Sequence, residues 1–162
     1  MNIISVKQFD TQNGPHVRTS IWVAGCSNNC KGCWSKHTWN PNQGRTLDKE
    51  YLEEIYNICS NKQVKGISIL GGDPFYYYMN FNVRSIFNLI DKLNILNKPI
   101  WVWTGYTIEE LLKNINKEDL LSFKKIDTLI DGRFDITKRD LTLKWKGSSN
   151  QRIINIKNYF NQ

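Results

Sequence analysis

The chain has no apolar run approaching the roughly 18 to 20 residues that cross a membrane, and nothing at its start resembles a signal peptide. Its four cysteines offer no disulfide framework, because three of them fall within eight positions. Since disulfides are rare in reducing compartments, we expect a cytoplasmic protein without a membrane segment. Internal repeats, low-complexity tracts and linkers are also lacking, so the 162 residues predict one domain.

No run of five like charges accompanies the net charge of +7. Basic residues are spread through the chain, with a modest concentration at Lys138, Arg139, Lys144, Lys146 and Arg152. We interpret this charge mainly as a solvated surface. An acidic partner protein or anionic ligand comes second, and nucleic acid is the least favoured partner.

Strand-like and helix-like hydrophobic periods alternate along the chain. Such alternation predicts an α/β fold, a parallel sheet of βα units that stays open or curls into a shortened, partial (β/α) barrel. We expect one domain over 1–162, with a core at about 9–135 and C-terminal strands and tail at 136–162. The expected strands are 3–9 (at an edge), 18–24, 66–70, 99–103, 126–130, 141–143 and 153–156, and the expected helices are 48–61, 80–96 and one from Thr107.

Three cysteines follow the strand at 18–24 directly. Cys26, Cys30 and Cys33 are soft thiolate ligands, which select zinc, copper(I) or iron–sulfur centres. His37 would complete a four-ligand zinc site, whereas three cysteines around a four-iron cluster leave one iron without a protein ligand. Both interpretations stay open on the cysteine pattern alone.

Three further polar or glycine-rich turns end predicted strands: Gly71-Gly72-Asp73-Pro74, Thr104-Gly105-Tyr106 and Asp131-Gly132. The carboxyl ends of parallel strands share one edge of a sheet, and ligands bind there. We therefore expect these turns to converge with the cysteines on one site.

The cysteine spacing Cys26-x3-Cys30-x2-Cys33, followed by Gly71-Gly72-Asp73-Pro74 after the next strand, resembles the radical S-adenosylmethionine (SAM) superfamily. Segments 13–15, 32–34, 103–106, 131–134 and 145–151 resemble the anaerobic ribonucleoside-triphosphate reductase activating proteins, over about residues 9 to 152. One position departs from this pattern. His16 stands where the family usually has glycine, which puts a glycine-only backbone conformation there in doubt.

The resemblance implies a radical SAM enzyme with a shortened or partial barrel of that type. Three cysteines would hold a [4Fe–4S] cluster, and SAM would bind the open iron and yield a 5′-deoxyadenosyl radical that takes a glycine α-hydrogen from the reductase. The implied partners are the large subunit of an anaerobic ribonucleoside-triphosphate reductase and a one-electron donor such as flavodoxin. The residues expected to hold the cluster or SAM are Cys26, Cys30, Gly32, Cys33, Trp34, Gly71, Gly72, Asp73, Thr104 and Asp131.

Two other functions remain as alternatives. One is a small-molecule radical SAM enzyme of the deazaguanine-pathway type, and the other is a zinc-binding module without enzymatic activity. Individual residues also carry open alternatives: Thr104 and Asp131 either line the SAM site or only satisfy backbone groups, and the Trp101–Trp103 face is either core or ligand contact. Cys59 is expected in the core.

Overall fold

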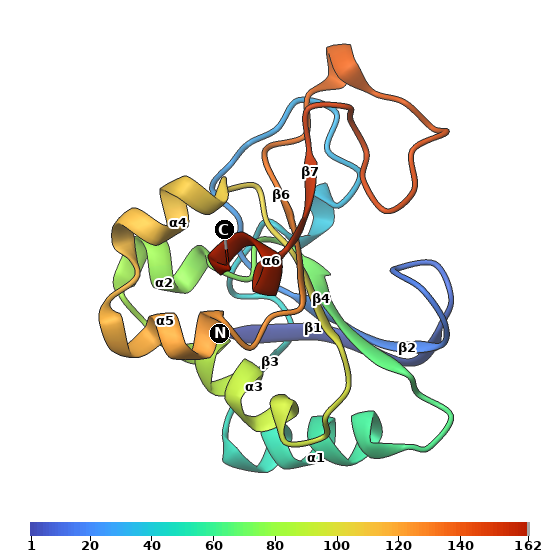
Figure 1. Ribbon diagram of the computed structural model, residues 1–162, viewed down its shortest axis with the longest axis vertical. Coiled ribbons are helices and arrows are strands. Elements are labelled where there is room, and N and C mark those ends of the chain that lie inside the picture. The colour runs from blue at the N-terminus through green and yellow to red at the C-terminus, as the bar shows by residue number, and fades with distance from the viewer. Residues whose placement is uncertain (162) are drawn as a thin grey trace.

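A mixed sheet of seven strands, in the order β3-β1-β2-β4-β5-β6-β7, forms the centre of the computed structural model, which describes residues 1–161 (Figure 1). The strands are β1 (Asn2–Asp10), β2 (Arg18–Val23), β3 (Arg45–Thr46), β4 (Gly66–Gly71), β5 (Ile100–Trp103), β6 (Thr128–Asp131) and β7 (Arg152–Asn155). The helices are α1 (Lys49–Ser60), α2 (Tyr76–Phe81), α3 (Ser85–Asn94), α4 (Ile108–Asn114), α5 (Lys117–Phe123) and α6 (Ile156–Phe160), with short 3-10 helices at Lys36–Thr38 and Ile136–Lys138.

The four central strands β2, β4, β5 and β6 are parallel and connected through helices, which confirms the predicted α/β class. The expectation of an all-parallel sheet was wrong, because β1, β3 and β7 pair antiparallel. The short connection from β1 to β2 permits only a hairpin, since a parallel pair needs a crossover of a dozen residues or more. Strand β1 is also not the edge expected for 3–9, because β3 pairs with Asn2 and Ile3. With β3 and β7 as edges the described sheet is open, so a radical SAM barrel stays a prediction.

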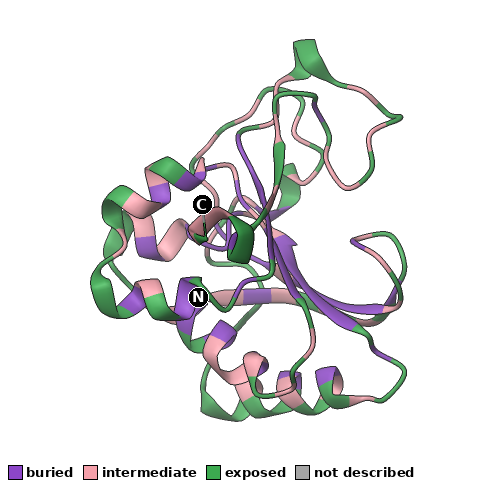
Figure 2. Cartoon of the chain, in the orientation of Figure 1, coloured by how far each residue is buried: buried purple, intermediate pink, exposed green. Residues whose placement is uncertain are grey.

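Alternation along the parallel strands separates two faces of the sheet. Ile21, Ile69 and Val102 belong to the buried core, and the helices gather over that side of the sheet (Figures 1 and 2). Their neighbours Trp22, Leu70 and Trp103 line a pocket instead. Of the two tryptophans in the Trp101–Trp103 stretch, Trp103 lines the pocket, whereas Trp101 is buried outside the pocket lining, and contact with a ligand stays a prediction.

Capping side chains set the helix ends where the sequence indicated them. Asp48 accepts a hydrogen bond from the Tyr51 amide and begins α1, and Cys59 near its end is fully buried, as expected. The capping box of Thr107 and Glu110 begins α4.

The single helix expected over 80–96 was wrong. Asn82 adopts a left-handed φ of +55° and its amide bonds back to carbonyls of α2, so the chain breaks there and α3 begins at Ser85. Val83, expected on the apolar stripe, is consequently exposed. Asparagine tolerates the left-handed region because its short polar side chain hydrogen-bonds locally.

The C-terminal region also differs from expectation. Residues 141–143 form a turn rather than a strand, and Leu141 is 84% exposed. The strand expected at 153–156 is β7, but it ends at Asn155, whose side chain accepts from the Asn158 amide and begins α6. Helix α5 was missed because its seven residues are too few for a clear hydrophobic period, whereas α4, of the same length, was indicated by its capping box.

His16 keeps a left-handed backbone, with φ +62°, in the turn before β2. The conformation in doubt is therefore retained without a glycine. Nearby, Arg18 in β2 is 1% exposed and donates to the Ser68 hydroxyl and to the carbonyls of Ile67 and Pro99. These bonds join β2 to β4 and to the residue that precedes β5. Among the helices of residues 1–161, none combines the length and apolar character that a bilayer crossing needs.

Candidate iron–sulfur site

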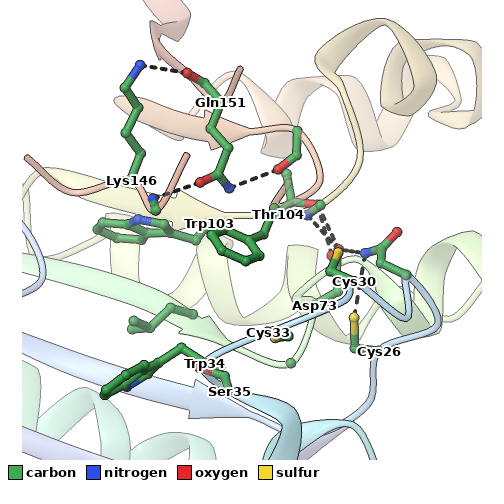
Figure 3. Close-up of a pocket in the computed structure, with 18 of the residues that line it drawn as sticks. Cys26, Cys30, Cys33, Trp34, Ser35, Asp73, Trp103, Thr104, Lys146 and Gln151 are labelled. Atoms are coloured by element: carbon green, nitrogen blue, oxygen red, sulfur yellow. Dashed lines mark hydrogen bonds between the residues drawn. The ribbon is translucent and has the colours of Figure 1, made fainter. Parts of the chain in front are cut away.

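A pocket of about 530 Å³ lies on the face of the sheet opposite the helices, at the carboxyl ends of the parallel strands (Figure 3). This volume is typical of small-molecule sites. The structure brings together in its lining most of the residues that the sequence predicted: Cys26, Cys30, Gly32, Cys33, Trp34, Gly71, Gly72, Asp73 and Thr104.

The cysteine loop is held by backbone hydrogen bonds to the segment after it. The amides of Gly25 and Cys26 donate to the carbonyls of Thr38 and Trp39, at 2.9 and 3.2 Å, and the Cys33 amide donates to the Cys30 carbonyl at 3.2 Å. All three thiols are half-buried. The bonds to Thr38 and Trp39 join residues thirteen positions apart and close the loop at the pocket wall, where the three cysteines lie.

Burial raises the pKa of the Cys26 thiol to about 11, although hydrogen bonds from the backbone and side chain of Asn28 oppose the rise. Burial raises the pKa of Cys30 as well. Iron binds the thiolate, so loading must release these protons.

The donor set suits an iron–sulfur cluster. Three soft thiolates line one pocket, and a four-iron cluster accepts three protein ligands with one iron left open. His37 is exposed on the first 3-10 helix and does not line the pocket. Within residues 1–161 no three His, Cys, Asp or Glu side chains are grouped as they would be around a single metal ion. The zinc interpretation therefore gains no support here.

The Gly71-Gly72 turn packs directly against the start of the cysteine loop. A Cβ on Gly72 would lie 2.4 Å from the Gly25 carbonyl oxygen, and Gly71 has φ +114°. The amides of Gly72 and Asp73 donate to the carbonyls of Val23 and Gly25, at 2.8 and 2.7 Å. In the structure these glycines permit the close approach of two loops, and their expected contact with SAM stays a prediction.

Asp73 is buried and joins three loops. Its carboxylate accepts hydrogen bonds from the Asn28 side chain at 2.8 Å, from the Thr104 hydroxyl at 2.9 Å and from the backbone amides of Gly105 and Phe75. Burial outweighs these bonds and raises the pKa of Asp73 to about 6. Thr104 also accepts from the Tyr106 amide, so it satisfies a backbone group while lining the pocket. The expected contact of Asp73 with SAM stays a prediction.

Asp131 was expected beside SAM, but the structure places it outside the pocket lining. Its fully buried carboxylate accepts from Arg152 Nε at 2.9 Å and from the Ile108 amide at 2.8 Å. Arg152 also binds Glu109, and this bond lowers the pKa of that carboxyl to about 2. Asp131 therefore joins β6, α4 and β7, which matches the alternative that it satisfies backbone groups.

A segment that the predicted site residues omitted, 139–151, closes one side of the pocket. The Trp103 indole donates to the Trp145 carbonyl at 2.7 Å. The Gln151 side chain binds the Gly147 amide and the Gly132 carbonyl (Figure 3). The sequence did carry one indication of this segment, because residues 145–151 resemble the activating proteins. Trp34, expected among the residues that hold the cluster or SAM, lines the pocket with 89% of its surface exposed.

Comparison with known proteins gives this site a family. A family model described as a 4Fe-4S single cluster domain matches residues 12–154. A protein of Escherichia coli (strain K12) is 37% identical over 155 residues, covering 93% of this chain and 96% of its own, and it is named anaerobic ribonucleoside-triphosphate reductase-activating protein. The chain belongs to this family of activating proteins.

Two further members carry the same name. The protein of Vibrio cholerae is 35% identical over 157 residues, covering 94% of this chain and 97% of its own. That of Enterobacteria phage T4 is 33% identical over 157 residues, covering 94% and 93%. All three cysteines and the Gly71–Asp73 turn fall inside the 4Fe-4S match, so the family assignment covers the whole candidate site.

Proposed function

We propose that this chain activates an anaerobic ribonucleoside-triphosphate reductase by generating a glycyl radical on its large subunit. The observation that carries this proposal is the convergence of three thiols with the Gly71–Asp73 turn on one pocket, in a chain whose relatives are named for that activation. The enzyme class is a radical SAM oxidoreductase.

Cys26, Cys30 and Cys33 would hold a [4Fe–4S] cluster, whose fourth iron has no protein ligand in this proposal. When bound, the cluster would supply one electron to break a C–S bond of SAM, giving methionine and a 5′-deoxyadenosyl radical that abstracts a glycine α-hydrogen. The electron would come from a donor such as flavodoxin, in the cytoplasm.

The protein would position SAM beside the cluster and enclose both in a cavity. Gly32, Trp34, Gly71, Gly72 and Thr104 line the pocket near the thiols and are our proposed contacts for SAM, together with Cys33 and Asp73. The aromatic residues Trp22 and Trp103 on the sheet face, with the 139–151 segment, cover part of the cavity. Such cover would keep water from a radical intermediate.

The test is anaerobic reconstitution followed by incubation with SAM, a strong one-electron reductant and the reductase. We expect four irons per chain and a glycyl radical by electron paramagnetic resonance. Cys26→Ala, Cys30→Ala and Cys33→Ala should each abolish SAM cleavage, while the control Cys59→Ala, in the core of α1, should cleave SAM.

Formation of 5′-deoxyadenosine without a glycyl radical would contradict the proposal and favour the small-molecule alternative. One tightly held zinc and no iron would contradict both radical functions. Loss of SAM cleavage in Cys59→Ala with an intact cluster would show that the assignment of Cys59 to a purely structural place in the core of α1 is wrong.

A further inference from the structure

One asparagine inside the cysteine loop touches both a candidate iron ligand and the buried anchor of the site. The side-chain nitrogen of Asn28 lies 2.8 Å from Asp73 Oδ2 and 3.5 Å from Cys26 Sγ (Figure 3). A carboxylate only accepts hydrogen bonds, so the nitrogen of the amide must face Asp73. Its two hydrogens serve the carboxylate and the sulfur together.

The place of Asn28 is fixed from a third direction by Gly105. A Cβ on Gly105 would lie 2.3 Å from Asn28 Nδ2 and 2.8 Å from its Cγ. Gly105 is not among the glycines with a positive φ, so its backbone conformation does not require glycine. The space that the Asn28 amide occupies is what excludes a side chain at position 105.

The anchor itself is rigid, because Asp73 is 1% exposed and is also held by Thr104 and by the amides of Phe75 and Gly105. The neighbouring Asn29 differs in every respect: it is exposed, and its side chain binds only the Ser27 carbonyl. Asn28 alone of the two connects the loop to the site.

We propose that Asn28 is a positioning residue that orients Cys26 and, in the loaded protein, donates an N–H···S hydrogen bond that raises the reduction potential of the cluster. Hydrogen bonds to ligand sulfurs tune iron–sulfur potentials. The bond favours the reduced cluster because that state places more negative charge on its sulfurs. This inference uses the cluster of the proposed function but does not depend on SAM cleavage.

The test is a redox titration of the reconstituted protein without SAM or reductase. In Asn28→Ala we expect the oxidised-to-reduced ratio at a fixed potential to rise roughly three- to tenfold, where tenfold corresponds to a shift of 59 mV for one electron. The control is Asn29→Gly, since glycine accepts the φ of +50° at that position, and its ratio should equal that of the wild type.

If Asn28→Ala does not retain its cluster, two further measurements test the hydrogen bond from Asn28 to the Cys26 sulfur. Gly105→Ala keeps Asn28 in the chain but removes its space, and should shift the ratio in the same direction. In the wild type, asparagine labelled with 15N at the side-chain amide should give a nitrogen hyperfine coupling to the reduced cluster by pulsed electron paramagnetic resonance.

A full cluster with wild-type potential in Asn28→Ala, or no 15N coupling in the wild type, would overturn the proposal. Either result would leave the activation of the reductase untouched. A chain that binds no four-iron cluster under any condition would instead refute the proposed function.

Discussion

Replacing Gly72 by alanine tests whether the Gly71-Gly72 turn is built for contact between two loops. The added Cβ would lie 2.4 Å from the Gly25 carbonyl oxygen, whereas ordinary contact begins at about 3.4 Å, so the loops must separate by about 1 Å. That movement would break the hydrogen bonds of 2.8 and 2.7 Å between the loops. Gly72 is not among the glycines with positive φ, so backbone strain does not contribute.

The expected loss follows from these contacts. Overpacking a filled site costs about 1–3 kcal/mol, and each hydrogen bond contributes about 0.5–1.5 kcal/mol net. We expect Gly72→Ala to lower the free energy of unfolding of the apoprotein by about 3 kcal/mol. For a chain of this size that corresponds to a fall in Tm of roughly 6–12 °C.

The assay is urea and thermal denaturation followed by far-ultraviolet circular dichroism, with iron content after reconstitution as a second readout. Gly147→Ala is the matched control, because the nearest atoms to its Cβ would belong to side chains: the ring of Phe134 at 3.1 Å, which can shift, and Gln151 Oε1 at 3.7 Å, an ordinary contact. Both substitutions reduce the entropy of the unfolded chain equally, so that effect cancels in the comparison. Free energies of unfolding extrapolated from denaturant carry an error of about 10–15%. If the free energies of unfolding of Gly72→Ala and Gly147→Ala agree to within about 0.5 kcal/mol, the loop-contact explanation is wrong.

Other perturbations test the rest of the structure. Arg152→Ala leaves the Asp131 carboxylate buried without its guanidinium, so we expect a loss of about 3–5 kcal/mol in urea denaturation, and a loss below 1 kcal/mol would contradict the described pairing. In the apoprotein at pH 8, iodoacetamide should modify Cys59 only after unfolding, because burial raises the pKa of that thiol to about 12; rapid labelling of the native chain, read by mass spectrometry, would place Cys59 outside the core. Cys26, whose pKa burial raises to about 11, should react at roughly a hundredth of the rate of a free cysteine, and its alkylation should accelerate as the pH rises toward 11. Arg18→Met should destabilise the fold by about 1–3 kcal/mol, since the four acceptors of its guanidinium lose their donor; thermal unfolding at the wild-type temperature would refute that role.

Much of the site could be predicted because it depends on local pattern. The spacing of Cys26, Cys30 and Cys33, and the strand before them, place the thiols at a strand end without any knowledge of distant contacts. The same holds for Asp73, which directly follows the Gly71-Gly72 turn. Residues that share a strand-end position therefore meet in space when the strands are parallel.

The parts that could not be predicted depend on long-range contacts. Asp131 stands at a strand end like Asp73, but Arg152, which lies twenty-one residues further along the chain, pairs with its carboxylate. Asn28 carries no period or motif of its own, and its role follows only from the positions of Asp73 and Gly105. The antiparallel pairing of β7 could not be predicted either, since the hydrophobic pattern of a strand does not indicate the direction in which it pairs.

The placement of the cysteine loop has a consequence for the order in which the protein matures. The loop belongs to the crossover between β2 and β4, and the bonds that shape it come both from inside that crossover, at Thr38 and Trp39, and from beyond β4, where the Asp73 amide binds the Gly25 carbonyl. Pairing of β2 with β4 closes more than forty residues of chain, and such closure is slow compared with local structure. We therefore expect iron to be captured late in folding, by a chain whose central strands are already joined.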